Sequence, residues 1–238
     1  MTPEPSPRTV PAPTTEALRH PAAVLWDMDG TLVDTEPYWL QAEMDMVHGA
    51  GGVWTAEDGL QLVGSGLERS ALIIQSRGVQ LSVSEIVETL TNRVREQIAE
   101  HLPWRAGARE LLLELREAGI PTALVTMSIR TMALDVAARL GFAGFDVVVA
   151  GDDVENAKPH PEPYLRAAEL LGVDITECVA LEDSEPGTAS AVASGATVFA
   201  LPLHIALPPS SAYIRRETMV GLNLAELSRA AGLSKNLS

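Results

Sequence analysis

The sequence has few residues of several kinds, and each shortage excludes a class of protein. Its 238 residues include one cysteine, Cys178, so no disulfide can form within the chain and a reducing cytoplasm is the expected compartment. Lysine and arginine number 17 against 32 acidic residues, a net charge of −15 that argues against nucleic acid or an anionic membrane as a partner. No apolar run approaches the roughly 20 residues of a membrane span.

Aromatic residues make up only 4% of the chain, but hydrophobic residues reach 46%, enough for a substantial core. Residues 1–20 are different, because they hold five prolines and no apolar segment of signal-peptide type. We expect a disordered N-terminal tail over residues 1–20, followed by a globular monomer.

Apolar runs and amphipathic segments alternate through most of the remaining chain. This alternation with short loops predicts an α/β fold with a doubly wound, Rossmann-like parallel sheet. A further strand is predicted near residues 217–220 and a helix at 224–230. Strands are expected at 22–26, 120–126, 145–150, 178–181 and 197–201, and helices at 108–118, 130–140, 161–171 and 185–194.

Residues 37–102 interrupt this alternation with helical patterns alone. Ser82 and Glu85 have the spacing of a capping box, and apolar residues then recur every four positions. The pattern predicts an inserted all-α domain at 37–102. Residues 21–36 and 103–238 would then form the core domain.

Polar residues with chemical potential stand where the predicted strands end. Asp27 follows the first strand, Thr126 ends the second, and Glu182 with Asp183 ends another, while Lys158 lies in a loop after a strand. Ligands of open α/β sheets bind outside the carboxyl ends of the strands. We therefore expect these distant segments to converge on one site.

Asp27 and Asp29 flank a single residue, so in an extended segment both carboxylates point to the same side. Carboxylates so close repel one another unless a cation or a proton lies between them. From the residues alone, this segment is equally readable as an acidic turn, Thr126 as an ordinary strand residue and Lys158 as a solvated lysine.

The segment 27–37, which begins Asp27-Met28-Asp29-Gly30-Thr31, resembles the first motif of the haloacid dehalogenase superfamily. The later motifs of that family match in order. They are Thr126 within 124–128, Lys158 within 157–161, and Glu182-Asp183 followed by Gly187. The helical segment after the first motif resembles the cap of the branch that holds sugar-phosphate phosphatases, phosphoglycolate phosphatases and beta-phosphoglucomutases.

The resemblance implies a role for each motif residue. Asp27 would attack phosphorus and form an aspartyl-phosphate, and Asp29 would act as general acid and then general base. Thr126 would hydrogen-bond a phosphoryl oxygen, with Met127 beside it, and Lys158 would pair with the phosphoryl group. A dehalogenase would not need Asp29, so its presence argues against that activity.

The resemblance also implies a Mg²⁺ site. Asp27, Glu182 and Asp183, with the backbone carbonyl of Asp29, would supply the hard oxygen ligands that this ion prefers. The single cysteine is expected to be buried and inert. His160, which stands between two prolines, is expected to be structural.

Substrate choice should depend on the helical insertion. Beta-phosphoglucomutases typically carry a histidine soon after the first motif and an arginine shortly after a cap glycine, where this chain has Trp39 and Leu67. Trp39 is a candidate substrate contact or a core residue, and Arg93 a candidate substrate contact or a solvated residue. Residues 64–66 form either a mobile cap loop or a plain turn. Tyr38, Trp39, Gln41 and Glu43 look more like hexitol and deoxy-sugar phosphatases.

These patterns predict a Mg²⁺-dependent phosphatase that acts on a small phosphorylated sugar or polyol. Two alternatives remain open from the sequence. The first is a beta-phosphoglucomutase-like sugar phosphomutase, which would isomerise its substrate with little phosphate release. The second is a non-catalytic binding or regulatory protein of the same fold, which would turn over no phosphomonoester.

Overall fold

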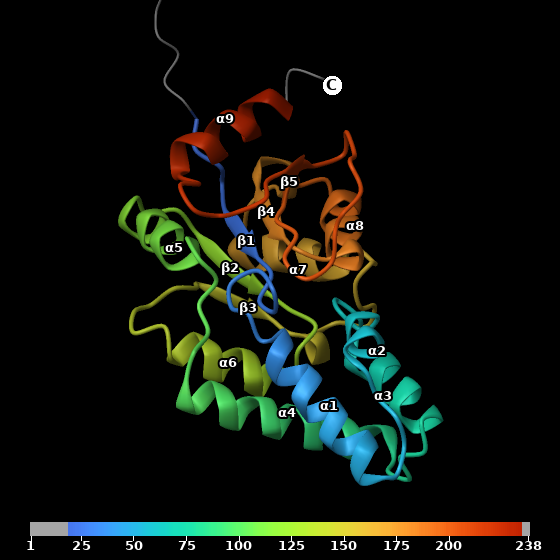
Figure 1. Ribbon diagram of the computed structural model, residues 1–238. Helices are drawn as coiled ribbons and strands as arrows, with labels where there is room; N and C mark the ends of the chain where they lie inside the picture. The colour runs from blue at the N-terminus through green and yellow to red at the C-terminus, as the bar shows by residue number, and fades with distance from the viewer. Residues whose placement is uncertain (1–18, 235–238) are drawn as a thin grey trace, which may run out of the picture.

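A six-stranded parallel sheet forms the centre of the computed structural model, which describes residues 19–234 (Figure 1). The strand order β3-β2-β1-β4-β5-β6 confirms the predicted doubly wound α/β fold. The predicted N-terminal tail lies outside the described residues, apart from its last two. The strands are β1 (Val24–Trp26), β2 (Thr122–Val125), β3 (Val147–Val149), β4 (Val179–Glu182), β5 (Thr197–Ala200) and β6 (Ile214–Arg215).

Strand β1 occupies the middle of the sheet because its three residues are apolar and buried on both faces. Leu25 stands opposite Ala123 of β2 on one side and Ala180 of β4 on the other. The two strands that carry later motifs are therefore direct neighbours of the strand that carries the first.

Helices cover both faces of the sheet, since successive side chains of a strand point to opposite faces. Leu25 packs in the cluster formed with α7 (Glu162–Leu171) and α8 (Glu185–Ser194). Trp26 packs in the second cluster, to which α5 (Ala108–Glu117), α6 (Arg130–Ala138) and α9 (Leu224–Ser234) contribute. The result is a three-layered core.

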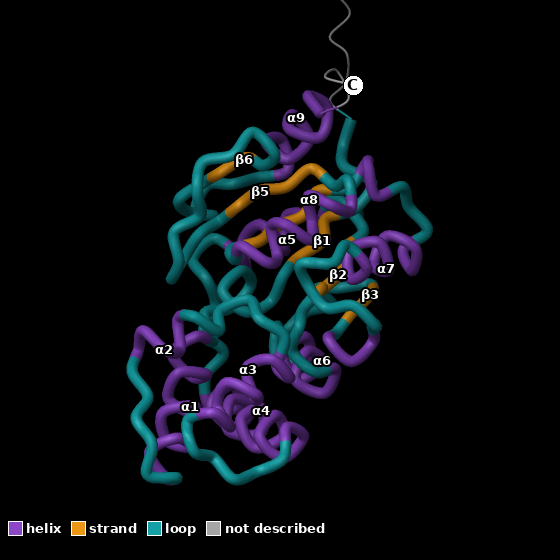
Figure 2. Tube along the Cα trace, turned by 90° about the vertical axis from the view of Figure 1, so that its right-hand side faces the viewer, coloured by secondary structure: helices purple, strands orange, loops and turns teal. Residues whose placement is uncertain are grey.

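Between β1 and β2 the chain forms α1 (Glu36–Gly49), α2 (Ala56–Leu60), α3 (Leu67–Ser76) and α4 (Val83–Glu100), which we call the helical insertion. Figures 1 and 2 show these helices gathered at one end of the molecule. Short 3₁₀ helices at Gly151–Asp153 and Ile175–Glu177 complete the elements.

Helix α4 shows why the sequence pattern after Ser82 predicted a helix. Ser82 and Glu85 form the predicted capping box, each side chain accepting from the backbone N–H of the other. One face of the helix is buried, while the other carries charged residues. The buried face consists of Ile86, Leu90, Thr91, Val94 and Ile98.

No helix within the described residues 19–234 is both long and apolar enough to cross a membrane.

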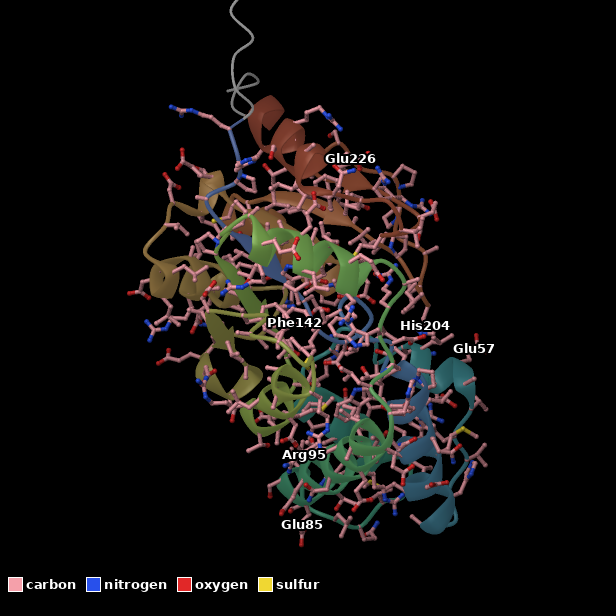
Figure 3. All side chains as sticks on the ribbon, turned by 90° about the vertical axis from the view of Figure 1, so that its left-hand side faces the viewer. Glu57, Glu85, Arg95, Phe142, His204 and Glu226 are labelled. Carbon is pink, nitrogen blue, oxygen red and sulfur yellow. The ribbon has the colours of Figure 1, made fainter. Side chains whose placement is uncertain are left out.

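The helical insertion and the core are in direct contact. Nε of Arg95 on α4 lies 2.6 Å from Oδ2 of Asp135 on α6, and Arg95 is labelled in Figure 3. The loop at Gly64 touches the core, because a Cβ added there would overlap the hydroxymethyl group of Ser184. A cleft of about 1130 Å³ opens between the two parts.

One predicted strand is wrong. Residues 217–220 contain no strand, and the chain instead pairs Ile214–Arg215 with β5. Met219 is fully buried in a loop packed against Gly107, whereas Val220 is 57% exposed. Met219 is therefore buried by loop packing and not by a place in the sheet.

Candidate active site

The predicted motif residues meet at the carboxyl ends of the three central strands. Asp27 follows β1, Thr126 follows β2, and Asp183 follows Glu182 at the end of β4. The backbone N–H of Asp27 donates to Leu181 O at 3.0 Å, so the ladder between β1 and β4 continues into the site. The parallel register therefore brings Asp27 together with Thr126, 99 residues further along the chain, and with Asp183, 156 residues further along.

Lys158 is the centre of the charge network. Its Nζ donates to Oδ1 of Asp27 at 2.7 Å, to Oε1 of Glu182 at 2.7 Å and to Val125 O at 2.9 Å. These bonds use all three ammonium donors. Burial alone would lower the pKa of Lys158, but the carboxylates of Asp27 and Glu182 raise it above its ordinary value. Lys158 is therefore a fixed cation.

Glu182 is surrounded by donors on both oxygens. Oε1 accepts from Nζ of Lys158 and from the hydroxyl of Tyr164, each at 2.7 Å. Oε2 accepts from the N–H of Asp183 at 3.2 Å and from the N–H and hydroxyl of Ser184 at 3.5 and 3.3 Å. A carboxylate offers about four lone-pair sites, so Glu182 is saturated and orients Lys158.

A glycine makes room for this carboxylate. A Cβ at position 187 would overlap both oxygens of Glu182. Gly187 lies in the first turn of α8, whose N-cap Ser184 accepts from the N–H of Gly187 at 3.2 Å. The glycine that follows the fourth motif therefore has a steric cause.

The carboxyl group of Asp27 has two unlike oxygens. Oδ1 is bound to Lys158, whereas Oδ2 is buried and has no hydrogen-bond partner in the described part of the chain. Burial, followed by the neighbouring charge of Glu182, raises the pKa of Asp27 to about 7, although Lys158 acts in the opposite direction. An unpartnered buried acceptor is costly unless a cation, a proton or a ligand satisfies it.

Asp183 belongs to the same cluster of carboxylates as Asp27. Its Oδ1 accepts from the hydroxyl of Thr31 at 3.2 Å, and its carboxylate packs against Gly30. Burial and then the charge of Asp27 raise its pKa well above the usual range. Carboxylate oxygens of Asp27, Glu182 and Asp183 lie within 4.8 Å of one another. This buried set of hard oxygen donors fits a divalent cation such as Mg²⁺.

Gly30 allows Asp183 to approach the first motif. Its φ of +84° lies in the region that favours glycine, and a Cβ there would overlap the Asp183 carboxylate. Arg105 fixes the turn, since its buried guanidinium donates to Gly30 O at 2.7 Å and to Pro202 O at 3.0 Å. Arg105 was not predicted, because nothing in its local sequence distinguishes it from a surface arginine.

Asp29 is held apart from the charge network by side-chain donors. Oδ1 accepts from Thr35 at 2.5 Å and from Nε1 of Trp39 at 3.2 Å. Oδ2 accepts from Ser128 at 2.8 Å and Thr126 at 3.3 Å. Both side-chain oxygens of Asp29 are therefore occupied by donors, and of this residue only the backbone remains for the predicted metal site.

Thr126 and Met127 also border the site. The hydroxyl of Thr126 accepts from the N–H of Ser128 at 3.0 Å while it donates to Asp29, and Sδ of Met127 accepts from the N–H of Lys158 at 3.3 Å. Both residues line a cavity of about 60 Å³ that also reaches Asp27. The cavity shares part of its lining with the wider cleft.

The two residues of the helical insertion that were predicted to contact the substrate, Trp39 and Arg93, lie in different surroundings. Trp39 is buried, lines the cavity and bonds to Asp29, so it is both a core residue and a site residue. Arg93 does not line the cavity. Its guanidinium lies 3.8 Å from Asp45 on an exposed face of the helical insertion, so the geometry gives no support to a substrate contact.

Two acidic residues of α1 complete the cavity wall. Burial, followed by the charge of Asp29, raises the pKa of Glu36 to about 8. Burial raises the pKa of Glu43 to about 7, opposed by a hydrogen bond from Nε1 of Trp54. Sequence analysis used Glu43 only for the likeness to hexitol and deoxy-sugar phosphatases, and Glu36 only as part of the first motif, without a role for either side chain. Their seven-residue spacing puts both on the helix face that carries Trp39, which is the signal that could have found them.

The remaining sequence predictions concern residues outside the site. Cys178 is buried, its Sγ donates to Asp174 O at 3.3 Å, and burial raises the pKa of its thiol to about 12. His160 lies on the surface, where Nδ1 accepts from the N–H of Glu162 at 3.3 Å.

The comparisons with known proteins agree with this geometry. A family model described as haloacid dehalogenase-like hydrolase matches residues 21–195. The chain is 35% identical over 178 residues to "Phosphorylated carbohydrates phosphatase" of Thermotoga maritima, which covers 73% of this chain and 81% of that protein. It is 32% identical over 169 residues to "Hexitol phosphatase B" of Escherichia coli, covering 69% and 76%.

Solved structures show the same fold. A CbbY variant from Rhodobacter sphaeroides in complex with xylulose-(1,5)bisphosphate has a TM-score of 0.80 and 26% identity, over 87% of this chain and 99% of that chain. The beta-phosphoglucomutase of Clostridium difficile has a TM-score of 0.79 at 21% identity, over 90% and 99%. The family predicted from four ordered motifs is confirmed, and this chain is an enzyme of the haloacid dehalogenase-like hydrolase family.

Proposed function

We propose that this protein is a Mg²⁺-dependent phosphatase that hydrolyses a small phosphorylated sugar or polyol through an aspartyl-phosphate. The observation that carries the proposal is the asymmetric carboxyl group of Asp27. Lys158 holds Oδ1, and Oδ2 has no partner among the described residues while Asp27 lines the cavity. An oriented oxygen with a free lone pair beside a fixed cation is suited to attack phosphorus.

Attack of this oxygen on the phosphoryl group would release the sugar or polyol alkoxide. Asp29 lines the same cavity and would donate the proton that the alkoxide needs. It would then remove a proton from the hydrolytic water, which attacks phosphorus, breaks its bond to the Asp27 oxygen and releases phosphate. Thr126 and Ser128, which now donate to Asp29, would keep this carboxyl group in position. Two nearby carboxyl groups with separate partners can carry these separate roles.

Asp27 and Asp183 would hold Mg²⁺, together with the backbone carbonyl of Asp29. Glu182 belongs to the same cluster, but its oxygens already accept five hydrogen bonds, so it is less suited to direct coordination. When bound, Mg²⁺ would neutralise negative charge on the phosphoryl group during transfer.

The relatives support a carbohydrate or polyol phosphate as substrate, because their names describe phosphatases of phosphorylated carbohydrates and hexitols. The mutase alternative has less support. Trp39 and Leu67 stand where mutases typically carry histidine and arginine, and both line the cavity. The structural likeness to a mutase at 21% identity concerns the fold alone.

The test is phosphate release from a panel of phosphomonoesters with Mg²⁺, for the wild-type protein and for Asp27→Asn. The panel contains hexose 6-phosphates, a deoxyhexose 6-phosphate, hexitol phosphates, phosphoglycolate, glycerol phosphate and beta-glucose 1-phosphate. We expect release from sugars or polyols, reduced by at least about 10³-fold in Asp27→Asn, since the nucleophile is lost. Asp45→Asn, on the outer face of α1, is the matched control.

Three outcomes would contradict parts of the proposal. Isomerised product without free phosphate would favour the mutase. No turnover of any phosphomonoester would favour a binding role. Full activity in Asp27→Asn, with a wild-type circular dichroism spectrum, would remove the assignment of the nucleophile.

A further inference from the structure

Helix α1 presents a row of three side chains to the cavity. Glu36, Trp39 and Glu43 are spaced by three and four residues, which places them on one helix face, and all three line the cavity beside Asp27. Trp39 is bound to Asp29. The hydrolysis proposed above uses neither Glu36 nor Glu43.

The two glutamates retain free acceptors. Glu43 is only 5% exposed, and its Oε2 accepts from Nε1 of Trp54 at 3.2 Å, while Oε1 has no hydrogen-bond partner in the described part of the chain. Within residues 19–234, neither oxygen of Glu36 accepts a hydrogen bond. Carboxyl oxygens that have no donor, on residues that line a cavity, are suited to accept hydrogen bonds from hydroxyl groups of a ligand.

The cavity has little positive charge to offer a second anion. Among the described residues that line it, Lys158 is the one cation, and its three donors are already used by Asp27, Glu182 and a backbone carbonyl. Leu67 lines the wall as well. Any negative group on the ligand beyond the reacting phosphate would face Glu36 or Glu43.

The described lining of the wider cleft also contains more acidic than basic residues. Its described lining contains Arg69 and Arg95, in addition to Lys158, and Arg95 is paired with Asp135. The acidic residues of the same lining are Glu68, Glu88, Asp152 and Glu155.

We infer that Glu36 and Glu43 determine specificity by accepting hydrogen bonds from an uncharged, hydroxyl-bearing substrate and by leaving a second anionic group without a cationic partner. The inference rests on the proposed phosphatase function. It names the substrate class as monophosphates of neutral sugars or polyols, with bisphosphates and phosphorylated sugar acids excluded. A second anion would find only acidic groups and no free cation on this part of the wall, so the exclusion acts through the cost of an unpaired charge in the cavity as well as through lost contacts.

This selectivity differs from what the structural neighbours alone would suggest. The CbbY variant similar to this chain is bound to a bisphosphate. Because the wall of the cavity contains two glutamates and Leu67, we expect this protein to prefer monophosphates to bisphosphates.

The experiment compares sorbitol 6-phosphate with 6-phosphogluconate, which differ only in a terminal hydroxymethyl or carboxylate group. Wild-type kcat/KM should favour sorbitol 6-phosphate by about 100-fold. Glu43→Gln keeps an acceptor for Trp54 and replaces the acid by an amide whose N–H can donate to a carboxylate, and we expect it to narrow the kcat/KM ratio by about tenfold. Glu36→Gln should act in the same direction, and Asp45→Asn, which removes a charge from the exposed face of α1, should leave the ratio unchanged.

A third substrate, p-nitrophenyl phosphate, separates the two proposals. Suppose that p-nitrophenyl phosphate is hydrolysed but the wild type has equal kcat/KM for sorbitol 6-phosphate and 6-phosphogluconate. The specificity role of the glutamates is then overturned, and the phosphatase function remains. The same holds if neither glutamine variant changes this kcat/KM ratio. If no substrate releases phosphate, both fail. Should Glu43→Gln not fold, Glu36→Gln and calorimetric binding of the pair to Asp27→Asn provide the same comparison.

Discussion

Nζ of Lys158 lies 2.7 Å from Oδ1 of Asp27, and this single contact makes the two oxygens of the aspartate unequal. The bound oxygen is fixed, and the other is buried without a partner in the described residues. The protein thereby keeps one lone pair available in an otherwise saturated network. Glu182 also binds Nζ of Lys158 at 2.7 Å, and it thereby keeps this ammonium group where it contacts Oδ1 of Asp27 and leaves Oδ2 free.

Binding of Mg²⁺ should stabilise the protein through Asp183. We expect EDTA-treated wild-type protein to gain several degrees in Tm with Mg²⁺, because ligand at about 100 times Kd contributes about 2.7 kcal/mol to the free energy of unfolding. The gain should vanish in Asp183→Asn and persist in Asp45→Asn. Differential scanning fluorimetry measures it, and an equal shift in all three proteins would remove Asp183 from the metal site.

Replacement of Gly187 by alanine should disrupt the site. The added Cβ would overlap both oxygens of Glu182, so the carboxylate must move and Lys158 must lose a partner. We expect kcat to fall by at least about 100-fold and the free energy of unfolding to fall by about 1–3 kcal/mol.

Gly49→Ala is the control, since no atom lies within 4 Å of a Cβ at that position. Its kcat and its midpoint of urea unfolding should match those of the wild type. A Gly187→Ala protein with normal activity would show that the Glu182 carboxylate can shift without effect.

Tyr164 positions Glu182 without contacting substrate. It is fully buried, its hydroxyl donates to Oε1 of Glu182 at 2.7 Å, and Nζ of Lys158 lies 5.1 Å from its ring centroid. Tyr164→Phe should lower the free energy of unfolding by about 1–3 kcal/mol, because a hydrogen bond to a buried carboxylate is lost. It should lower kcat by about tenfold with KM unchanged.

Tyr38→Phe is the control, because the hydroxyl of Tyr38 donates to the backbone carbonyl of His101 at 3.3 Å in an exposed position. That variant should differ from the wild type by less than about 0.5 kcal/mol in urea unfolding. Equal effects of the two substitutions would contradict the positioning role.

Glu43 should make stability depend on pH. Its pKa rises from 4.5 to about 7 on folding, so the native state binds the proton more tightly than the unfolded state. The stabilisation from this proton is fully present below about pH 4.5 and is lost as the pH rises through 7. The shift corresponds to at most about 3 kcal/mol.

Glu43→Gln stays neutral at every pH. Its Tm relative to the wild type should therefore increase by about 5 °C between pH 5 and pH 8 in the absence of Mg²⁺. Thermal unfolding followed by circular dichroism measures this difference. A Tm difference that is constant over this range would show that Glu43 does not titrate on folding.

The sequence could place most of the motif residues at the ends of strands, because each of these follows a short apolar run. Asp27, Thr126 and Asp183 could be placed at one edge of the sheet, since parallel strands put their carboxyl ends together. Lys158 needed the family resemblance, because its loop has no strong local pattern. The predicted strand at 217–220 failed because a strand requires a partner, and β5 pairs with Ile214–Arg215 instead.

The residues that surround the motifs were harder to predict. Tyr164 and Arg105 act through side-chain contacts with residues 18 and 75 positions away, and no local pattern reports such contacts. Arg93, which stays a predicted substrate contact, also depends on tertiary packing. Its position on α4 left its direction open, and the folded insertion turns it toward Asp45 on an exposed face.

The sequence by itself determined the alternation of strands and helices, the parallel sheet and the convergence of four motifs, because these depend on periodicity and on the order of segments along the chain. Only the tertiary structure decided which oxygen of Asp27 is free, what Glu182 binds, and which face of α1 lines the cavity. These features depend on side-chain packing between distant elements, where a shift of about one ångström separates a hydrogen bond from an unpaired charge.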